Sequence, residues 1–288
     1  MAKSTGSDAP PDELIDLKEA ARRLGVHYMT AYRYLRTGRL AGTRRDSRWW
    51  IRTDDLERFR PGRADATARR GRAGRDRYRH RLRGRILAGD EPGAWQVLES
   101  AMAAGATPSA AMLDVLAPAM RDIGAGWERG QITIGEEHRA TAVALRLVGR
   151  LGPRFARPGR QRGTVVVACA PGDSHSLPSA MLATVLRGEG FEVIELGGDT
   201  PTGAVVAASR AVGSRLRAVG ISVSVSDRLP AAARTVRRVR QAVPSGTVVL
   251  LGGPAVPSAA RARELGAHDW AADAAAVAAL LHAGGPLP

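Results

Sequence analysis

The stretch from Thr164 to Pro201 reads TVVVACAPGDSHSLPSAMLATVLRGEGFEVIELGGDTP, which is an apolar run, a loop, a helix-like segment and a second apolar run. Similar β-branched runs follow at 216–224, 247–252 and 268–270, with helix-like segments between them and a terminal helix at 273–282. Apolar strands that alternate with helices are typical of a parallel sheet covered on both faces. This pattern predicts a doubly wound, flavodoxin-like (Rossmann-like) α/β domain over residues 163–288.

The segment before this domain has helical periodicity. Apolar residues recur at helical spacing within residues 78–150, as at Met112, Leu116 and Met120. Breaks at 89–93, 105–108 and 124–134 divide the segment, which predicts a four-helix bundle. Residues 61–77 are rich in Gly, Ala and Arg and predict a linker that runs into a helix near Tyr78; residues 151–163 predict a second linker.

The composition limits the class of protein. The 288 residues include 43 Lys and Arg against 28 Asp and Glu, and a single cysteine, Cys169, which excludes an internal disulfide and a Cys-rich metal cluster. Cys169 lies inside the first strand, so we expect it in the core. No apolar run reaches the roughly 18 residues of a transmembrane helix, and the first residues lack the apolar core of a signal peptide. We therefore expect a cytoplasmic protein with no membrane partner.

The basic excess is concentrated at one end of the chain. Residues 1–85 carry 23 Lys and Arg against 11 Asp and Glu. A local excess of this kind indicates a polyanion partner, here double-stranded DNA. The alternative is a genome that prefers Arg codons, which explains Arg over Lys but not why the excess is local.

Residues 1–60 predict a winged helix-turn-helix. Leu17, Ala20, Ala21 and Leu24 form one apolar helix face, and Gly25 allows a tight turn into a second helix at 27–36. Residues 40–51 predict a two-stranded wing with one of its two tryptophans in the core. Thr53 or Asp54 is expected to cap a last helix at 55–59. A small helical protein-interaction module is the alternative.

The same segment resembles the excisionase/MerR-type winged helix-turn-helix over about 45 residues. The resemblance assigns the second helix to the major groove and the wing tip to phosphates or the minor groove. The DNA-binding residues that it implies are His27, Tyr28, Thr30, Ala31 and Arg33 on the helix and Arg44, Arg45 and Arg48 on the wing.

Three short motifs follow predicted strands of the α/β domain. They are Asp173-Ser174-His175, the pair Ser222 and Ser224, and the pair Gly252 and Gly253. Ligands of doubly wound sheets bind beyond the carboxyl ends of the strands, so these motifs are placed for binding. Taken singly, each is weak, since a lone loop histidine is more often solvated and a Gly-Gly pair is usually a turn.

Together the three motifs resemble the signature of cobalamin-binding domains. The resemblance implies that His175 is the cobalt ligand on the lower face of the corrin and that Asp173 hydrogen-bonds the other ring nitrogen. Ser222 would bond the displaced nucleotide tail, and Gly252 and Gly253 would leave room for it. Ser174 and Ser224 complete the expected cofactor-binding loops. The sequence departs from the signature at Pro178, where the family has glycine.

A further motif lies in the helical segment. Nine residues separate Trp127 from the pair Glu137 and His138. This pattern, and the order of the three domains, resemble the cobalamin-dependent photoreceptor regulators of the CarH/LitR type. The resemblance implies that Trp127 covers an adenosyl group on the upper face, that Glu137 hydrogen-bonds its ribose or adenine, and that His138 supports the pocket or an oligomer contact. Glu128 stands where the family often has histidine. Bundle core and a solvated helix start are the alternative interpretations.

These observations predict a cobalamin-binding transcriptional regulator, not an enzyme, because a DNA-binding head is present and no substrate barrel or partner methyltransferase is. Adenosylcobalamin is the expected cofactor, with methylcobalamin and hydroxocobalamin as alternatives. Light would remove the upper ligand and change homo-oligomerisation and DNA binding. The alternatives are a light-independent corrinoid or redox sensor and a corrinoid methyl carrier.

Overall fold

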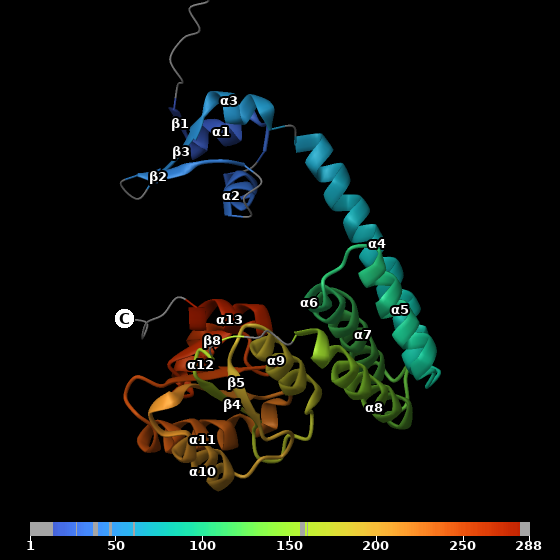
Figure 1. Ribbon diagram of the computed structural model, residues 1–288, viewed down its shortest axis with the longest axis vertical. Helices are drawn as coiled ribbons and strands as arrows, with labels where there is room; N and C mark the ends of the chain where they lie inside the picture. The colour runs from blue at the N-terminus through green and yellow to red at the C-terminus, as the bar shows by residue number, and fades with distance from the viewer. Residues whose placement is uncertain are drawn as a thin grey trace, which may run out of the picture. The chain divides into compact units, whose positions relative to one another are not determined.

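The computed structural model describes residues 14–26, 28–36, 40–45, 48–59, 61–155, 159 and 161–282 (Figure 1), and for residues 33, 36, 44, 45, 48 and 61–73 it describes the backbone alone. The chain divides into two compact units, residues 1–74 and 75–288. Within the described part, every helix is too short or too polar to cross a membrane.

The first unit is a small α/β head. Its three antiparallel strands lie in the order β1-β3-β2. Its elements are β1 (Leu14–Asp16), α1 (Leu17–Arg23), α2 (Tyr28–Arg36), β2 (Thr43–Arg45), β3 (Arg48–Arg52) and α3 (Thr53–Arg58). Tyr34, Leu40 and Ile51 are buried between sheet and helices, and Trp49 packs against them. The predicted winged helix-turn-helix is confirmed.

Local interactions explain the turn between α1 and α2. Asp16 caps α1 by accepting a hydrogen bond from the Glu19 amide at 2.8 Å. Gly25 has φ of 63°, a left-handed conformation that favours glycine. The Val26 amide then bonds back to the Ala21 carbonyl at 3.0 Å, which fixes the angle at which α2 begins.

Three details of the head differ from the sequence prediction. Strand β1 was not expected, since three residues are too few to show a period; it pairs with β3 through Ile15 and Ile51. Helix α3 begins at Thr53, so the N-cap position is held by Arg52 and not by the predicted Thr53 or Asp54. Ala31 was expected to face DNA but is fully buried in the head core, because it lies on the face of α2 that packs inward.

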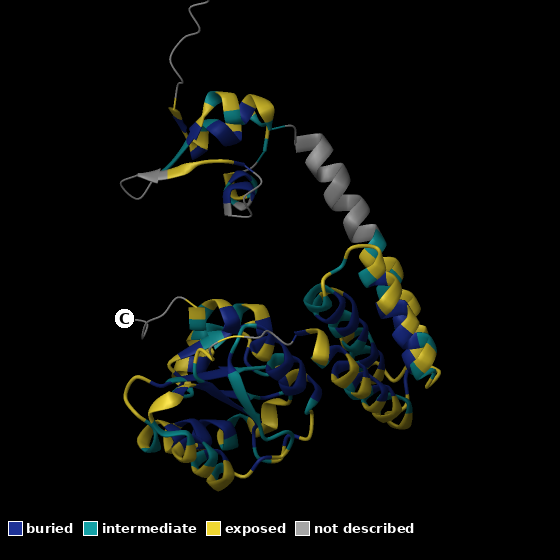
Figure 2. Ribbon diagram, viewed as in Figure 1, coloured by how far each residue is buried: buried dark blue, intermediate teal, exposed yellow. Residues whose placement is uncertain are grey.

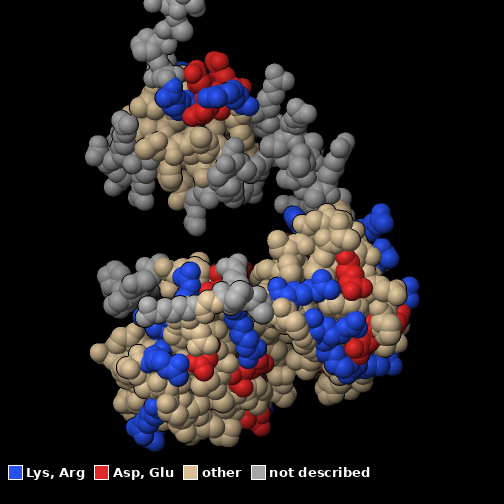
Figure 3. Space-filling model, viewed as in Figure 1, with Lys and Arg blue, Asp and Glu red and all other residues tan. Residues whose placement is uncertain are grey.

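The second unit begins with a helical bundle. Its helices are α4 (Pro61–Leu87), α5 (Glu91–Ala103), α6 (Pro108–Ala110), α7 (Ala117–Glu128) and α8 (Ile134–Leu151). Helix α4 begins within the first unit, and the π-helical turns of η1 (Ala111–Leu116) connect α6 to α7 without a break. A short 3₁₀ turn, η2 (Gly152–Phe155), follows. Basic and acidic side chains alternate over the bundle surface (Figure 3). The core is mostly aliphatic, as the low aromatic content requires, with Trp95 and Phe155 among its buried residues.

Two helix boundaries in the bundle differ from those predicted. Helix α4 begins at Pro61 rather than near Tyr78, because the Ala and Arg residues among its glycines are strong helix formers. Helix α7 continues through Gly124 and ends at Glu128, two residues before Gly130, whose φ is 68°. Gly124 meets no neighbouring atom that a side chain would disturb, so the glycine is tolerated inside the helix.

The remaining residues form the predicted doubly wound domain. Five parallel strands lie in the order β5-β4-β6-β7-β8, with the predicted flavodoxin-like topology. The strands are β4 (Thr164–Cys169), β5 (Glu192–Glu195), β6 (Leu216–Ser222), β7 (Val248–Gly252) and β8 (Asp269–Ala271). The helices and 3₁₀ turns are α9 (Leu177–Gly188), α10 (Thr202–Val212), η3 (Gly213–Arg215), η4 (Ser226–Arg228), α11 (Leu229–Ala242), α12 (Ala259–Glu264) and α13 (Ala274–His282). Figure 2 shows buried strands between helices that expose their outer faces.

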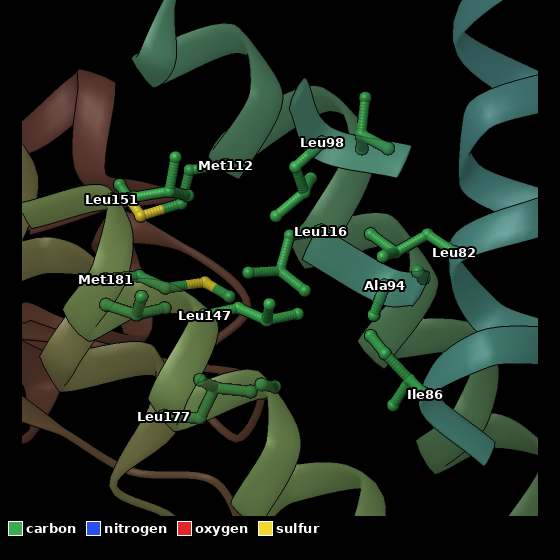
Figure 4. Close-up of a cluster of buried hydrophobic side chains, with 14 of the residues drawn as sticks. Leu82, Ile86, Ala94, Leu98, Met112, Leu116, Leu147, Leu151, Leu177 and Met181 are labelled. Atoms are coloured by element: carbon green, nitrogen blue, oxygen red, sulfur yellow. The ribbon is translucent and has the colours of Figure 1, made fainter. Parts of the chain in front are cut away.

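Helix α9 joins the α/β domain to the bundle. On one side, Leu177 and Met181 belong to the same apolar cluster as Leu147 and Leu151 of α8 and Met112 of η1 (Figure 4). On the other side, Leu186 packs with the strands of the sheet. The bundle and the sheet therefore share one helix, and the loop before that helix carries His175.

Candidate functional site

The sheet register brings the three motifs of the α/β domain together. Cys169, Ser222 and Gly252 are aligned across the neighbouring strands β4, β6 and β7. Strands β6 and β7 end on the first residue of their motifs, and Asp173 follows the end of β4 by four residues, so the motifs lie side by side at the carboxyl edge. Strand β4 lies between β5 and β6, where the strand order reverses, which is where doubly wound sheets bind ligands.

The strongest polar feature of this edge is the loop between β4 and α9. The Asp173 side chain is fully buried, and its Oδ1 lies 2.8 Å from the His175 Nδ1. The same oxygen accepts a hydrogen bond from the His175 amide at 3.1 Å, and Oδ2 accepts one from the Ser224 amide. With the carboxylate ionised, this arrangement selects the tautomer in which Nδ1 carries the proton.

The other ring nitrogen of His175 is left available. The imidazole side chain is 48% exposed, and no hydrogen bond to Nε2 occurs among the described residues. A neutral imidazole that is held at Nδ1 and open at Nε2 is the arrangement that a metal-ligating histidine needs. Ser174, which lies between Asp173 and His175 in the sequence, is also exposed.

A second loop holds this histidine loop in place. The Asp199 amide donates to the Asp173 carbonyl at 2.6 Å, and the Asp199 carboxylate accepts from the Gly172 amide. Asp199 has φ of 43°, a conformation that non-glycine residues rarely adopt. A side chain at Gly198 would lie 2.8 Å from the Ser174 carbonyl. Gly198 and Asp199 are therefore site residues that the sequence prediction lacks, although a Gly-Asp pair after a strand is a signal of a strained turn.

The loops after β6 and β7 fit against each other without space for added side chains. Gly253 has φ of 99°, and a Cβ there would collide with the backbone of Val223, including its carbonyl oxygen. A Cβ at Gly252 would lie 3.1 Å from the Ala271 carbonyl. Ser222 is half-buried at the end of β6. The Ser224 Oγ is buried and has no hydrogen-bond partner among the described residues.

These residues meet the requirements of a corrinoid with histidine below the cobalt. The open Nε2 of His175 is a suitable ligand for cobalt. The unpaired Ser224 hydroxyl requires a polar partner, because a buried hydroxyl without one costs free energy. Pro178, the departure from the signature, lies in the first turn of α9, where proline is well tolerated. The donor set and the orphaned hydroxyl therefore fit the group.

Cys169 does not contribute to this chemistry. Its side chain is buried at the end of β4, as predicted, with its sulfur 3.5 Å from the Ser179 Oγ and from the His175 carbonyl. Burial raises the pKa of the Cys169 thiol, so the reactive thiolate is disfavoured.

The predicted cap residues lie at the hairpin between α7 and α8. The Gly130 and Gln131 amides bond to the Trp127 and Gly126 carbonyls at 2.8 and 2.9 Å, which ends α7. Trp127 remains exposed, with 43% of the residue accessible, so it is not ordinary bundle core.

A capping box begins the next helix. Thr133 and Glu136 bond to each other's backbone amides at the start of α8. Glu137 therefore lies in the first turn of α8, and His138 follows it. Glu137 accepts a hydrogen bond from the Thr141 hydroxyl at 2.8 Å, and His138 is exposed with its Nε2 3.9 Å from the Glu137 carboxylate. No hydrogen bond or ion pair in the described part joins this hairpin to the histidine loop.

The predicted DNA-binding residues are described only in part. Tyr28 is 47% exposed at the start of α2, and Thr30 is half-buried. Arg33, Arg44 and Arg45 lie on α2 and β2, and Arg48 begins β3, but their side chains are outside the description, as is the whole of His27. On α1, Arg22 and Arg23 pair with Glu19 at 2.6 and 2.9 Å, and these pairs lower the pKa of Glu19 to about 2. Figure 3 shows acidic and basic side chains adjacent on this surface.

Comparisons with known proteins agree with this division of the chain. A helix-turn-helix domain family matches residues 14–61, and two families described as B12 binding domain match residues 78–151 and 163–280. The HTH-type transcriptional repressor CarH of Myxococcus xanthus is 35% identical over 182 residues, 63% of this chain and 59% of that protein. The chain thus spans less than two thirds of that relative.

Other similar proteins are corrinoid proteins of Methanosarcina. Trimethylamine corrinoid protein 1 of Methanosarcina acetivorans is 29% identical over 115 residues, 39% of this chain and 53% of that protein. The solved structure of the Methanosarcina barkeri monomethylamine corrinoid protein has a TM-score of 0.63 at 21% identity, and it covers 70% of this chain and 96% of its own. This second likeness supports the fold.

Fold, site and comparisons together define a class: a helix-turn-helix domain joined to both parts of a B12-binding domain. Within that class, the chain is similar to the CarH repressor, in line with the resemblance to CarH/LitR-type regulators that its sequence shows. The helix-turn-helix match and the repressor relative also support the prediction of a regulator over an enzyme.

Proposed function

We propose that this protein is a DNA-binding transcriptional regulator that binds adenosylcobalamin and responds to light. The observation that carries the proposal is the half-exposed His175 imidazole, held at Nδ1 by the buried Asp173 carboxylate at 2.8 Å. Buried carboxylates are costly unless they are fully hydrogen-bonded. This one is satisfied in a way that orients a single imidazole outward.

His175 would hold the cobalt through Nε2, and Asp173 would keep the ring in the correct tautomer and raise its basicity. The cofactor's own nucleotide base would then leave the lower face. Ser222 and Ser224 would hydrogen-bond the nucleotide tail. Gly252 and Gly253 would act indirectly, because without side chains they let the Ala271 carbonyl and the Val223 backbone pack closely and so shape the loops around the tail. The unpaired Ser224 hydroxyl supports this assignment.

Adenosylcobalamin would supply a cobalt–carbon bond that visible light breaks. Trp127, which is 43% exposed, would shelter the adenosyl group, and Glu137 would hydrogen-bond it. His138 would support this pocket or a contact between copies. A signal requires that the two states of the protein differ in their affinity for the two forms of the cofactor.

The shared helix α9 provides a path from the cofactor to the bundle. Leu177 and Met181 are buried with Leu147 of α8, and Leu177 comes two residues after His175. A displacement of His175 would therefore reach the bundle through packed side chains. We propose that the bundle responds by changing homo-oligomerisation.

Oligomerisation would control DNA binding because one small head binds weakly, whereas linked heads gain effective concentration. Tyr28, Thr30, Arg33 and His27 on or before α2 would contact bases or nearby phosphates, and Arg44, Arg45 and Arg48 would contact phosphates from the wing. The Arg-rich residues 61–77 would add sequence-independent contacts. Because the proposed partner is DNA, we place the protein in the cytoplasm.

The test uses the full chain prepared in the dark with added adenosylcobalamin. We expect a coloured complex whose spectrum, gel-filtration volume and affinity for a duplex from upstream of its own gene all change after green light. His175→Ala should weaken binding and alter the spectrum, while His80→Ala, which removes an exposed histidine of α4, should change neither. A colourless protein would overturn cobalamin binding. A coloured protein with the same size and DNA affinity before and after light would overturn light sensing.

One observation favours a second candidate, a light-independent corrinoid or redox sensor. Glu128, an exposed carboxylate, follows Trp127 where the family often has histidine, so a histidine ligand is absent from that position after the adenosyl group is lost. This candidate predicts DNA affinity that differs between cobalamin-loaded and cobalamin-free protein in the dark and does not change on illumination. Methylcobalamin and hydroxocobalamin can be compared in the same assay.

A further inference from the structure

Arg228 lies at the carboxyl edge of the sheet, on the connection between β6 and α11. It is the last residue of η4 (Ser226–Arg228), four positions after Ser224. A Cβ added to Gly172 would come within 3.1 to 3.2 Å of the Arg228 Nε, Cδ and Cζ atoms. The guanidinium group therefore packs on the backbone of the residue that precedes Asp173, where any side chain other than hydrogen would displace it.

The charge of Arg228 is not paired within the described residues. Other arginines of this domain lie within 4.0 Å of carboxylates, as Arg187 does with Glu195 and Arg261 with Glu264. The carboxylate of Asp199, which bonds the Gly172 amide, is not an ion-pair partner of Arg228 in the described structure. A guanidinium group that packs on this loop and forms no ion pair with a described carboxylate is suited to an anion from outside the chain.

Cobalamin has few anionic groups that could bind to Arg228. The amide groups around the corrin ring of cobalamin are neutral, and the nucleotide tail contains one phosphodiester. If His175 takes the cobalt, the tail has to leave the lower face beside the loop that Arg228 contacts. We infer that Arg228 binds the phosphodiester of the nucleotide tail, and that this contact makes the protein select complete cobalamins over corrinoids without a tail. The inference rests on the proposed cobalamin binding.

The physical basis is a charge-assisted hydrogen bond. Guanidinium groups bind phosphate oxygens through two parallel N–H donors, which lysine cannot reproduce. Arg228 is exposed, so salt will screen the interaction. Even so, a hydrogen bond to a charged group changes affinity by about tenfold or more.

The experiment compares two ligands in the dark, aquocobalamin, which has the tail, and diaquocobinamide, which lacks the nucleotide and its phosphodiester. Dissociation constants are measured by absorption for the wild type, Arg228→Ala and Arg228→Lys. Arg234→Ala is the matched control, since it removes an exposed, unpaired arginine of α11 from the same domain. Urea unfolding of each variant without ligand reports whether the fold is intact.

We expect Arg228→Ala to weaken cobalamin binding about tenfold and to leave cobinamide binding unchanged, with Arg228→Lys between wild type and alanine. Added salt should reduce the preference of the wild type for cobalamin. Equal weakening of both ligands would overturn the inference, because the role of Arg228 would then be to support the loop. Unchanged affinity for both would overturn it as well. A wild type that binds neither ligand would instead refute the proposed function.

Discussion

Replacement of Asp173 by asparagine would test whether the buried carboxylate orients His175. The wild-type carboxylate has two acceptor oxygens that together receive the His175 amide at 3.1 Å, the His175 Nδ1 at 2.8 Å and the Ser224 amide. Asparagine keeps the shape but replaces one acceptor by a donor. The two possible orientations of the amide have different consequences.

With the amide oxygen toward His175, the Ser224 amide faces an NH₂ group and loses its partner. Leaving one buried donor unpaired costs about 1–3 kcal/mol of the free energy of unfolding. With the oxygen toward Ser224, the His175 amide loses its partner, and Nδ1 can only accept. The ring proton then moves to Nε2, which is the nitrogen that cobalt needs. We therefore expect Asp173→Asn to lose stability and to bind cobalamin about 10- to 100-fold more weakly.

The assay is cobalamin titration by absorption together with urea unfolding of the unloaded protein. Asp227→Asn is the control, because it removes an exposed carboxylate from the same edge of the sheet. In a His175→Ala background, Asp173→Asn should still reduce stability but should no longer change cobalamin affinity. An Asp173→Asn protein with wild-type stability and affinity would refute the reasoning, since the carboxylate would then neither satisfy buried donors nor orient the ring.

Three further outcomes are expected. Leu147→Ala leaves a cavity where the bundle meets α9 and should lower the free energy of unfolding by about 2–5 kcal/mol in urea; a loss below 1 kcal/mol would contradict this packing. Gly253→Ala, at φ of 99° and in collision with backbone, should destabilise by about 1–3 kcal/mol, whereas Gly246→Ala, with open space around it, should be nearly neutral. Hydrogen bonds from the Gly93 amide and from Arg85 lower the pKa of Asp90 below its ordinary value of 3.8. Its stabilising contribution is therefore present above that pH and is lost as the pH falls through the lowered pKa, so the difference in unfolding midpoint between wild type and Asp90→Asn should shrink in acid and not grow.

The sequence predicted the element types well where the hydrophobic period was long and uninterrupted. The apolar strands at 164–170, 216–224 and 247–252 were found within about two residues of their observed bounds, because a strand buried on both faces has no polar positions to blur its pattern. The boundaries failed where side-chain propensities competed. Gly124 inside α7 and the glycines of α4 were expected to break helices, but neighbouring helix formers outweighed them.

The sequence alone determined which residues are candidates for the site, because a histidine two positions after an aspartate and serines and glycines after strands are local patterns. Only the tertiary structure decided what those residues do to each other. The Asp173 carboxylate reaches Ser224, which is 51 residues away, and Asp199, from a third loop, holds the Asp173 backbone. These contacts depend on the strand order β5-β4-β6-β7, which places the ends of distant strands side by side. The burial of Ala31, and the lack of an ion pair to Arg228 among the described residues, likewise follow from packing, since exposure is a property of all the neighbours of a residue and not of its position in the chain.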